Sequence, residues 1–166
     1  MNKRTKFLTL SAVIAALYVV LTALSALFGL DKGAIQLRLA EALTILPVVF
    51  PEAVLGLYIG CILANTFSGA LVADVFLGSL ATLIGAYGAY LLRRLPKKLI
   101  WVATLPTVIS NAIIVPLVLI FAYEVDMLYS FMLLTVSIGE LLSATLLGTV
   151  LYFALDKNGF FKKYAS

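Results

Sequence analysis

Six apolar runs fill most of this chain, and only short polar or charged stretches separate them. A transmembrane helix needs about 20 apolar residues, so six such helices would use about 120 of the 166 residues. The chain is 63% hydrophobic and 12% charged, whereas soluble domains are roughly half apolar and a quarter charged. The sequence therefore predicts an all-α integral membrane protein, one six-helix bundle over residues 1–166 with no separate extramembrane domain. The runs are 7–28, 34–50, 52–67, 69–92, 100–122 and 127–155.

The second run, 34–50, differs from the others because it contains two charged residues. Arg38 and Glu41 lie in its first half, and Pro47 and Pro51 bracket its end. As a helix its 17 residues would extend about 25 Å, which is short for a membrane crossing. We expect its first half to lie at the membrane interface or to be buried within the protein.

The distribution of basic residues predicts the orientation of the bundle. Cytoplasmic loops carry an excess of Lys and Arg, and a six-helix count places ten of the twelve basic residues on the side of the N-terminus. Only Lys32 and Arg38 fall on the other side. The sequence thus predicts a multi-pass protein of a bacterial plasma membrane with both termini cytoplasmic. The ten residues are Lys3, Arg4, Lys6, Arg93, Arg94, Lys97, Lys98, Lys157, Lys162 and Lys163.

Several kinds of chemistry require residues that this chain lacks. It contains no His and a single cysteine, Cys61, which argues against a His/Cys metal site and an internal disulfide. No segment fits the phosphate-binding pattern G-x-x-x-x-G-K-[ST], so ATP-driven transport would need partner subunits that hydrolyse the ATP. No Ser/His or Cys/His set supports a catalytic nucleophile. We therefore predict a protein that is not an enzyme and has no cofactor of its own.

Two polar residues are expected at membrane depth. Glu140 lies 13 residues into the last run, and Asn111 lies 11 residues into the run before it, which enters from the other side. The helical rise of 1.5 Å per residue brings them to a similar depth. Because burying such groups is costly, they are candidates for a substrate-binding cavity. The alternatives are a Glu140 that only joins helices and an Asn111 that only forms an interhelical amide bond.

A second polar group is expected towards the outer face. Arg38 and Glu41 are three residues apart and could pair on one helix face. Asn65 lies in the outer half of the third run, and Asp74 begins the fourth helix. All four are candidate substrate-binding residues, although the pair could be purely structural and Asp74 could be a helix-terminal charge.

Small residues suggest where helices meet. Ala12 and Ala16 form an Ala-x-x-x-Ala pair near the cytoplasmic end of the first run, and Ser11 and Ala15 widen the flat face. Such faces allow close helix contact, here either within the protein or with another one. A similar stripe on the fourth helix is interpreted as internal packing: Ala81, Gly85 and Ala89.

Four segments carry a resemblance to a known transporter family. They are 35–44 (IQLRLAEALT), 46–53 (LPVVFPEA), 56–65 (GLYIGCILAN) and 74–82 (DVFLGSLAT). With them the chain resembles the substrate-binding S components of energy-coupling factor (ECF) vitamin transporters. Within that group it is most similar to the QueT family of queuosine-precursor transporters.

The resemblance implies an architecture, partners and a substrate. It implies six helices with cytoplasmic ends and a binding site towards the outer face, covered by the loop at about 29–36. The implied partners are a transmembrane coupling protein, which would dock on Ala12 and Ala16, and two cytoplasmic ATPases. The implied substrate is a 7-deazaguanine base, with nitrile, aminomethyl and queuine forms all compatible. An S component for another vitamin-like molecule and an autonomous secondary transporter remain the alternative interpretations.

The candidate residues suit such a base. Its guanine-type edge presents adjacent N–H donors that a carboxylate accepts, and an asparagine pairs with a carbonyl and a ring nitrogen. A cationic aminomethyl arm would meet a second acid. Flat rings also stack on aromatic side chains, and four lie near the expected outer side: Phe28, Phe67, Tyr123 and Tyr129.

Overall fold

The computed structural model describes residues 2–31 and 35–161, and within these the chain is all-α. Six helical rods follow one another, as the apolar runs predict. The last two rods are composite, each continuing from one kind of helical winding into another. The rods are α1 (Lys3–Leu27); η1, a 3₁₀ helix (Leu39–Val48); α2 (Glu52–Phe67); α3 (Val72–Leu91); η2, also 3₁₀ (Lys97–Thr104), with α4 (Leu105–Phe121); and α5 (Tyr129–Glu140) with the π-helical η3 (Leu141–Leu147) and α6 (Gly148–Lys157).

Four of the six rods are long and apolar enough to cross a membrane. They are Lys3–Leu27, Val72–Leu91, Lys97–Phe121 and Tyr129–Lys157, whereas η1 and α2 have 10 and 16 residues. The prediction of six helices is therefore confirmed, and four of them have the length and composition of membrane spans.

The helix expected over 34–50 is shorter than predicted. It begins at Leu39, so Arg38 precedes it, and position 34 lies outside the described residues. Tertiary contacts explain the late start. Leu37 N–H donates to the Leu30 carbonyl (2.7 Å), Arg38 N–H to Ser143 Oγ (3.0 Å) and Leu39 N–H to Ser25 Oγ (2.9 Å). Because these backbone donors find partners outside a helix, an extended segment at 35–38 is stable.

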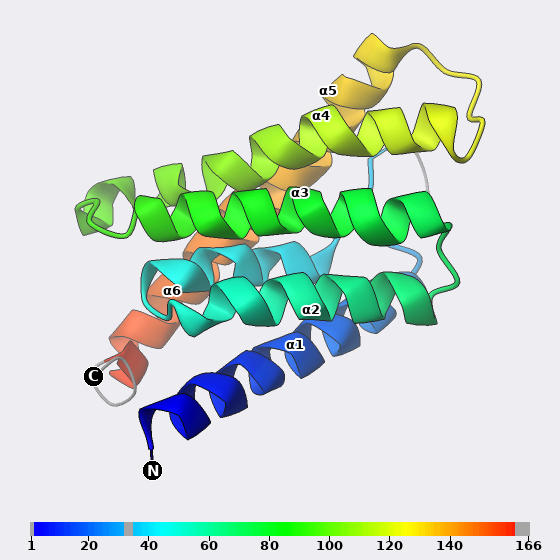
Figure 1. Cartoon of the computed structure of the whole chain (residues 1–166). Helices are drawn as coiled ribbons and strands as arrows, with labels where there is room; N and C mark the ends of the chain where they lie inside the picture. Colours follow the sequence, from blue (N-terminus) through cyan, green and yellow to red (C-terminus); the bar gives the residue numbers. More distant parts are fainter. Residues whose placement is uncertain (1, 32–34, 162–166) are drawn as a thin grey trace.

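The rods pack around η1. In Figure 1 the helices α1, α2, α3 and α4 lie in sequence order across the bundle, and each contacts the next. The short helix η1 contacts α1, α2, α3, η3 and α6, and its side chains from Ala40 to Pro47 are buried. The buried stretch therefore includes Glu41 but not Arg38, since residues 36–39 are half-buried and Ile35 is exposed, so the first half of the run is only partly inside the protein. The start of α1 and the end of α6 lie at the same end of the bundle (Figure 1).

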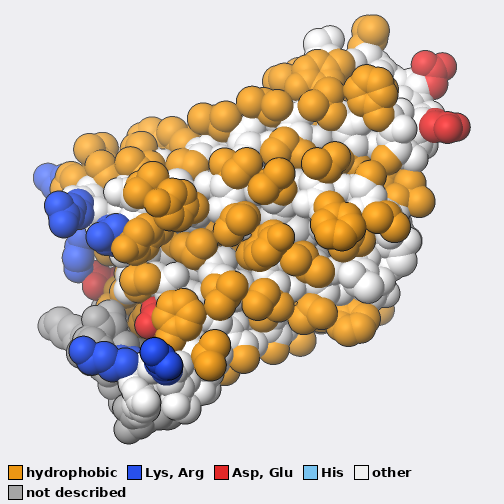
Figure 2. All heavy atoms as spheres, in the orientation of Figure 1, with side chains coloured by type: hydrophobic (Ala, Val, Ile, Leu, Met, Phe, Trp, Pro, Cys, Tyr) orange, Lys and Arg blue, Asp and Glu red, His pale blue; other side chains and the backbone are white. Residues whose placement is uncertain are grey.

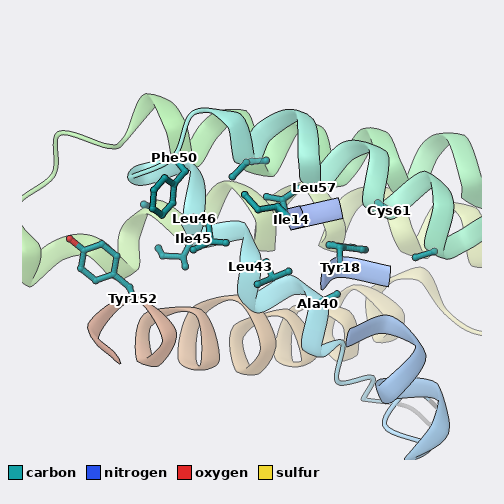
Figure 3. Close-up of a cluster of buried hydrophobic side chains, with 14 of the residues drawn as sticks. Ile14, Tyr18, Ala40, Leu43, Ile45, Leu46, Phe50, Leu57, Cys61 and Tyr152 are labelled. Atoms are coloured by element: carbon teal, nitrogen blue, oxygen red, sulfur yellow. The ribbon is translucent and has the colours of Figure 1, made fainter. Parts of the chain in front are cut away.

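The apolar core lies between η1, α1 and α2. Figure 3 shows Leu43 and Ala40 of η1 near Tyr18 of α1, with Cys61 of α2 close by. Glycines make the α1–α2 contact close. A Cβ on Gly60 would lie 2.8 Å from Tyr18 Cβ, a distance that real Cβ atoms do not tolerate.

The two sides of the small-residue motif on α1 have different surroundings. Ser11 and Ala15 are buried against α2, so their side of the flat face makes a contact within the protein, one of the two alternatives. Ala12 and Ala16 are exposed. The second stripe is internal, as predicted, with Ala81 fully buried on α3. On α1, Ser11 and Ala15 therefore face the inside of the protein, whereas Ala12 and Ala16 face outwards.

The surface has the charge distribution of a membrane protein. Figure 2 shows hydrophobic side chains over the flank of the bundle, with Lys and Arg and some acidic side chains at one end, and acidic side chains without visible Lys or Arg at the opposite end. At the basic end Lys97 Nζ pairs with Asp156 Oδ2 at 2.6 Å. The exposed lysine makes this pair a small contribution to stability. Lys32, Lys162 and Lys163 lie outside the described residues.

Candidate ligand-binding site

A cavity of about 780 Å³, called the main cavity below, opens at the acidic end of the bundle. It lies between the end of α1, the segment around 36–38, the α2–α3 turn and the end of α4. Its volume is in the usual range for small-molecule sites. Phe67 and Tyr123 contribute rings to it, as expected, whereas Phe28 and Tyr129 do not line it. The polar side chains that line it are Tyr18, Thr22, Ser25, Asp31, Gln36, Arg38, Asn65, Ser68, Asp74 and Tyr123.

Asn65 and Asp74 meet at the wall of the main cavity. Asn65 Nδ2 donates to the Asp74 backbone carbonyl at 3.3 Å. Between them the chain reverses at Gly69, whose φ of +73° suits glycine. The sequence-predicted outer group is thus partly assembled by one tight helix–helix turn.

Tyr123 ties the loop after α4 to the mouth of this cavity. Its hydroxyl donates to Asp74 Oδ2 (3.2 Å) and accepts from Leu71 N–H (3.1 Å). Burial is the largest cause that raises the pKa of Tyr123 above its ordinary value. The hydroxyl therefore keeps its proton near neutral pH and acts as the donor to the Asp74 carboxylate.

Deeper in the bundle, Arg38 stands among carboxylates. Glu41, Glu140 and Asp74 all lie close enough to attract its guanidinium. Glu41 is 1% exposed and Glu140 is 5% exposed. Buried carboxylates of this kind are stable only when paired or hydrogen-bonded. The cluster brings η1, α3 and α5 together around one positive charge.

Glu41 is held by a residue that the sequence did not single out. Tyr18 Oη donates to Glu41 Oε1 at 2.5 Å. The predicted direct Arg38–Glu41 pair on one helix face is wrong, because no ion pair joins them among the described residues and Arg38 lies outside the helix. A tyrosine in the middle of an apolar run was the available signal for this contact.

Asn111 and Glu140 come together, as the depth estimate predicted. The Asn111 amide neighbours the Glu140 carboxyl. In the part of the chain that the structure describes, three polar atoms of this cluster have no hydrogen-bond partner of standard geometry: Asn111 Nδ2, Glu140 Oε2 and Glu41 Oε2. Buried polar atoms without partners are costly, and a polar ligand would satisfy them.

The type of helix changes directly after Glu140, at the polar cluster. The regular helix α5 ends at Glu140, and the π-helical η3 begins at Leu141. Such π segments often occur at functional sites. Here the winding places Ser143 so that its Oγ accepts from Arg38 N–H. No pattern in the sequence pointed to this segment.

These six candidate residues thus fall into two connected groups. Asn65 and Asp74 line the main cavity, Glu41, Asn111 and Glu140 lie deeper, and Arg38 reaches both. No group of three or more His, Cys, Asp or Glu side chains in the described ranges is arranged to hold a metal ion.

Comparison with known proteins identifies the family. Residues 8–157 match the family described as QueT transporter. The chain belongs to the QueT transporter family. It is also 34% identical over 91 residues to a protein of Lactococcus lactis subsp. cremoris (strain MG1363) named "Queuosine precursor transporter QueT". That match covers 54% of this chain, which spans about half of the relative's length (53%). No solved structure matches the chain.

The family match agrees with two predictions. The family is described as one of transporters and not of enzymes, and four rods of this chain have the length and composition of membrane spans. The matched range includes all six candidate site residues and the Ala12/Ala16 pair.

Proposed function

We propose that this chain is the substrate-binding S component of an ECF-type transporter that takes up a queuosine precursor, a 7-deazaguanine base. The observation that carries the proposal is the family match across the whole polar cluster, residues 38–140 included. The name of the Lactococcus relative supports the substrate. The polar lining of the main cavity, and the unpartnered carboxylate oxygens of Glu41 and Glu140 that lie deeper than it, support a ligand rich in N–H donors.

Each candidate residue has a proposed role towards the base. Glu140 accepts hydrogen bonds from the donor edge of the ring, and Asn111 pairs with a neighbouring carbonyl and ring nitrogen. Glu41 and Arg38 balance the charge of the cluster. Asp74 and Asn65, in the wall of the main cavity, meet the substituent of the base, and an aminomethyl arm would bind the Asp74 carboxylate best.

We propose that the main cavity faces the outside of the cell. The basic end of the bundle, with the start of α1, is then cytoplasmic, in accordance with the positive-inside rule. The cavity lies at the opposite, acidic end. Asp31 and Gln36, on either side of positions 32–34, line it, which supports a covering role for the predicted loop at 29–36. Positions 32–34 themselves lie outside the described residues.

Transport would require partners. We propose a transmembrane coupling protein, which contacts the exposed Ala12 and Ala16 on α1, and two cytoplasmic ATPases that hydrolyse the ATP. The chain itself would then need no cofactor. The exposed position of these two small residues supports the contact, because a flat face lets another helix approach closely.

Proteoliposomes that hold this chain alone are expected not to accumulate a labelled 7-deazaguanine base. Adding a coupling protein and its ATPases, with ATP inside, should switch uptake on, since the energy comes from the partners. Vesicles with all subunits but without ATP are the control. Uptake by the chain alone, driven by a proton or sodium gradient, would contradict the proposal and identify a secondary transporter.

A further inference from the structure

A second, much smaller cavity lies beside the main one. It has a volume of about 10 Å³, and we call it the inner compartment. It is lined by Gln36, Arg38, Val115, Val136 and Glu140. A space of this size holds at most about one water molecule. Gln36 and Arg38 also line the main cavity, so these two residues border both spaces and lie between them.

One oxygen of a buried carboxylate that lines the inner compartment has no hydrogen-bond partner. Glu140 is 5% exposed and lines the compartment, and its Oε2 accepts no hydrogen bond from the described residues. Arg38 lines the same compartment and attracts this carboxylate, although no ion pair within 4.0 Å joins the two among the described residues. A donor-bearing ligand that reached Glu140 from the main cavity would therefore have to pass the guanidinium.

The backbone on which the wall stands is fixed from both sides. A Cβ on Gly139 would collide with the Gln36 carbonyl, so α5 packs directly on this segment. Arg38 N–H is bound by Ser143 Oγ (3.0 Å) and Leu39 N–H by Ser25 Oγ (2.9 Å). The backbone is therefore held, and any opening between the two spaces would have to come from a change of side-chain rotamer.

We propose that Gln36 and Arg38 form a side-chain partition that decides which ligands reach Glu140. A molecule passes only when Arg38 rotates away from the Glu140 carboxylate. That rotation leaves the buried Glu140 carboxylate without a nearby positive charge, which is costly. The partition therefore opens for ligands that bring their own N–H donors or positive charge. Anionic and donor-poor molecules of the same size stay in the main cavity. The identification of the ligand as a base rests on the proposed function, but the partition itself is testable without any ligand.

Thiol accessibility tests the partition. In a Cys61→Ala background, Val115→Cys places a thiol in the inner compartment, and Ser68→Cys places one in the main cavity as a matched control. The reagent is the small cation aminoethyl methanethiosulfonate, applied to detergent-purified protein with its melting temperature checked. With Gln36 and Arg38 present, Val115→Cys should react slowly and Ser68→Cys quickly.

Removing the Gln36 and Arg38 side chains should change the modification rate of Val115→Cys but not that of Ser68→Cys. Arg38→Ala together with Gln36→Ala is expected to raise the modification rate of Val115→Cys by about tenfold or more. A rise of this size would mean that the closed arrangement of the two side chains was populated about ten times more than the open one. The rate for Ser68→Cys should stay within about twofold, since its site opens to the main cavity in either case. If the double variant does not fold, Gln36→Ala alone, which removes no charge, should raise the rate in the same direction.

The contradicting results are specific. Equal modification rates for Val115→Cys and Ser68→Cys, with Gln36 and Arg38 present, would overturn the partition. An unchanged rate for Val115→Cys after Gln36→Ala would also overturn it. Protection of Val115→Cys by 7-deazaguanine bases would support both the partition and the proposed function. A partition that opens as expected while no deazaguanine protects the thiol would overturn the proposed substrate and leave the partition standing.

Discussion

Glu140→Gln is expected to raise the Kd for the base by about 30- to 1000-fold, which corresponds to roughly 2–4 kcal/mol. The substitution keeps the shape of the side chain but replaces one acceptor oxygen by an NH₂ donor. That donor would face the N–H groups of the ligand in a buried site, where Glu140 is 5% exposed. Calorimetric titration of the purified chain and its variant measures the change.

The fold should survive this substitution, because a neutral amide costs less to bury than a carboxylate. Thermal melts of both proteins without ligand test that. Asp126→Asn, which changes an exposed acid in the loop between α4 and α5, is the control for simple loss of negative charge. Unchanged affinity in Glu140→Gln would remove Glu140 from the site. A collapsed melt would make it structural, and Asp74, Asn65 and Glu41 would become the better candidates.

Ala12→Trp and Ala16→Trp are expected to abolish uptake by the assembled transporter and to leave ligand binding within about twofold of the original, since no new bulk reaches the cavity. Both residues are exposed, while their neighbours Ser11 and Ala15 carry the internal contact with α2. A large ring on the exposed side therefore blocks a partner helix and leaves the inner packing intact. Uptake in proteoliposomes and affinity of the isolated chain are the two measurements.

A tryptophan elsewhere on the apolar surface separates docking from general damage. Ile113 is 48% exposed on α4, and Figure 1 places α4 far from α1 across the bundle. Ile113→Trp should keep uptake. Loss of ligand binding in Ala12→Trp would show that its face packs internally, and normal uptake in both alanine variants would place the docking surface elsewhere.

The helices followed from the sequence where local pattern decides them. The predicted run 52–67 coincides with α2 (Glu52–Phe67), because Pro51 and the turn at Gly69 bound an uninterrupted apolar stretch. The run 34–50 was misjudged because distant groups decide its start. Arg38 N–H finds its acceptor in Ser143, 105 residues further along the chain, and no local pattern contains that contact.

The site was predictable in part for a similar reason. Constant helical rise placed Asn111 and Glu140 at one depth, and they are neighbours in the structure. The partner of Glu41 was missed, because Tyr18 reaches it only through the packing of α1 on η1. The π-helical segment after Glu140 was also missed. It lies next to Gly139, where α5 packs closely on the Gln36 backbone, and this tertiary contact cannot be read from the composition.

The central claim is that this chain alone binds a 7-deazaguanine base. Calorimetric titration of the detergent-purified chain, without partners, tests it most directly, using the nitrile, aminomethyl and queuine bases beside guanine and a set of vitamins. We predict saturable binding of at least one deazaguanine at a single site, with the vitamins inactive. At 100 times its Kd that base should stabilise the fold by about 2.7 kcal/mol. Binding of a vitamin with no response to any deazaguanine would contradict the claim.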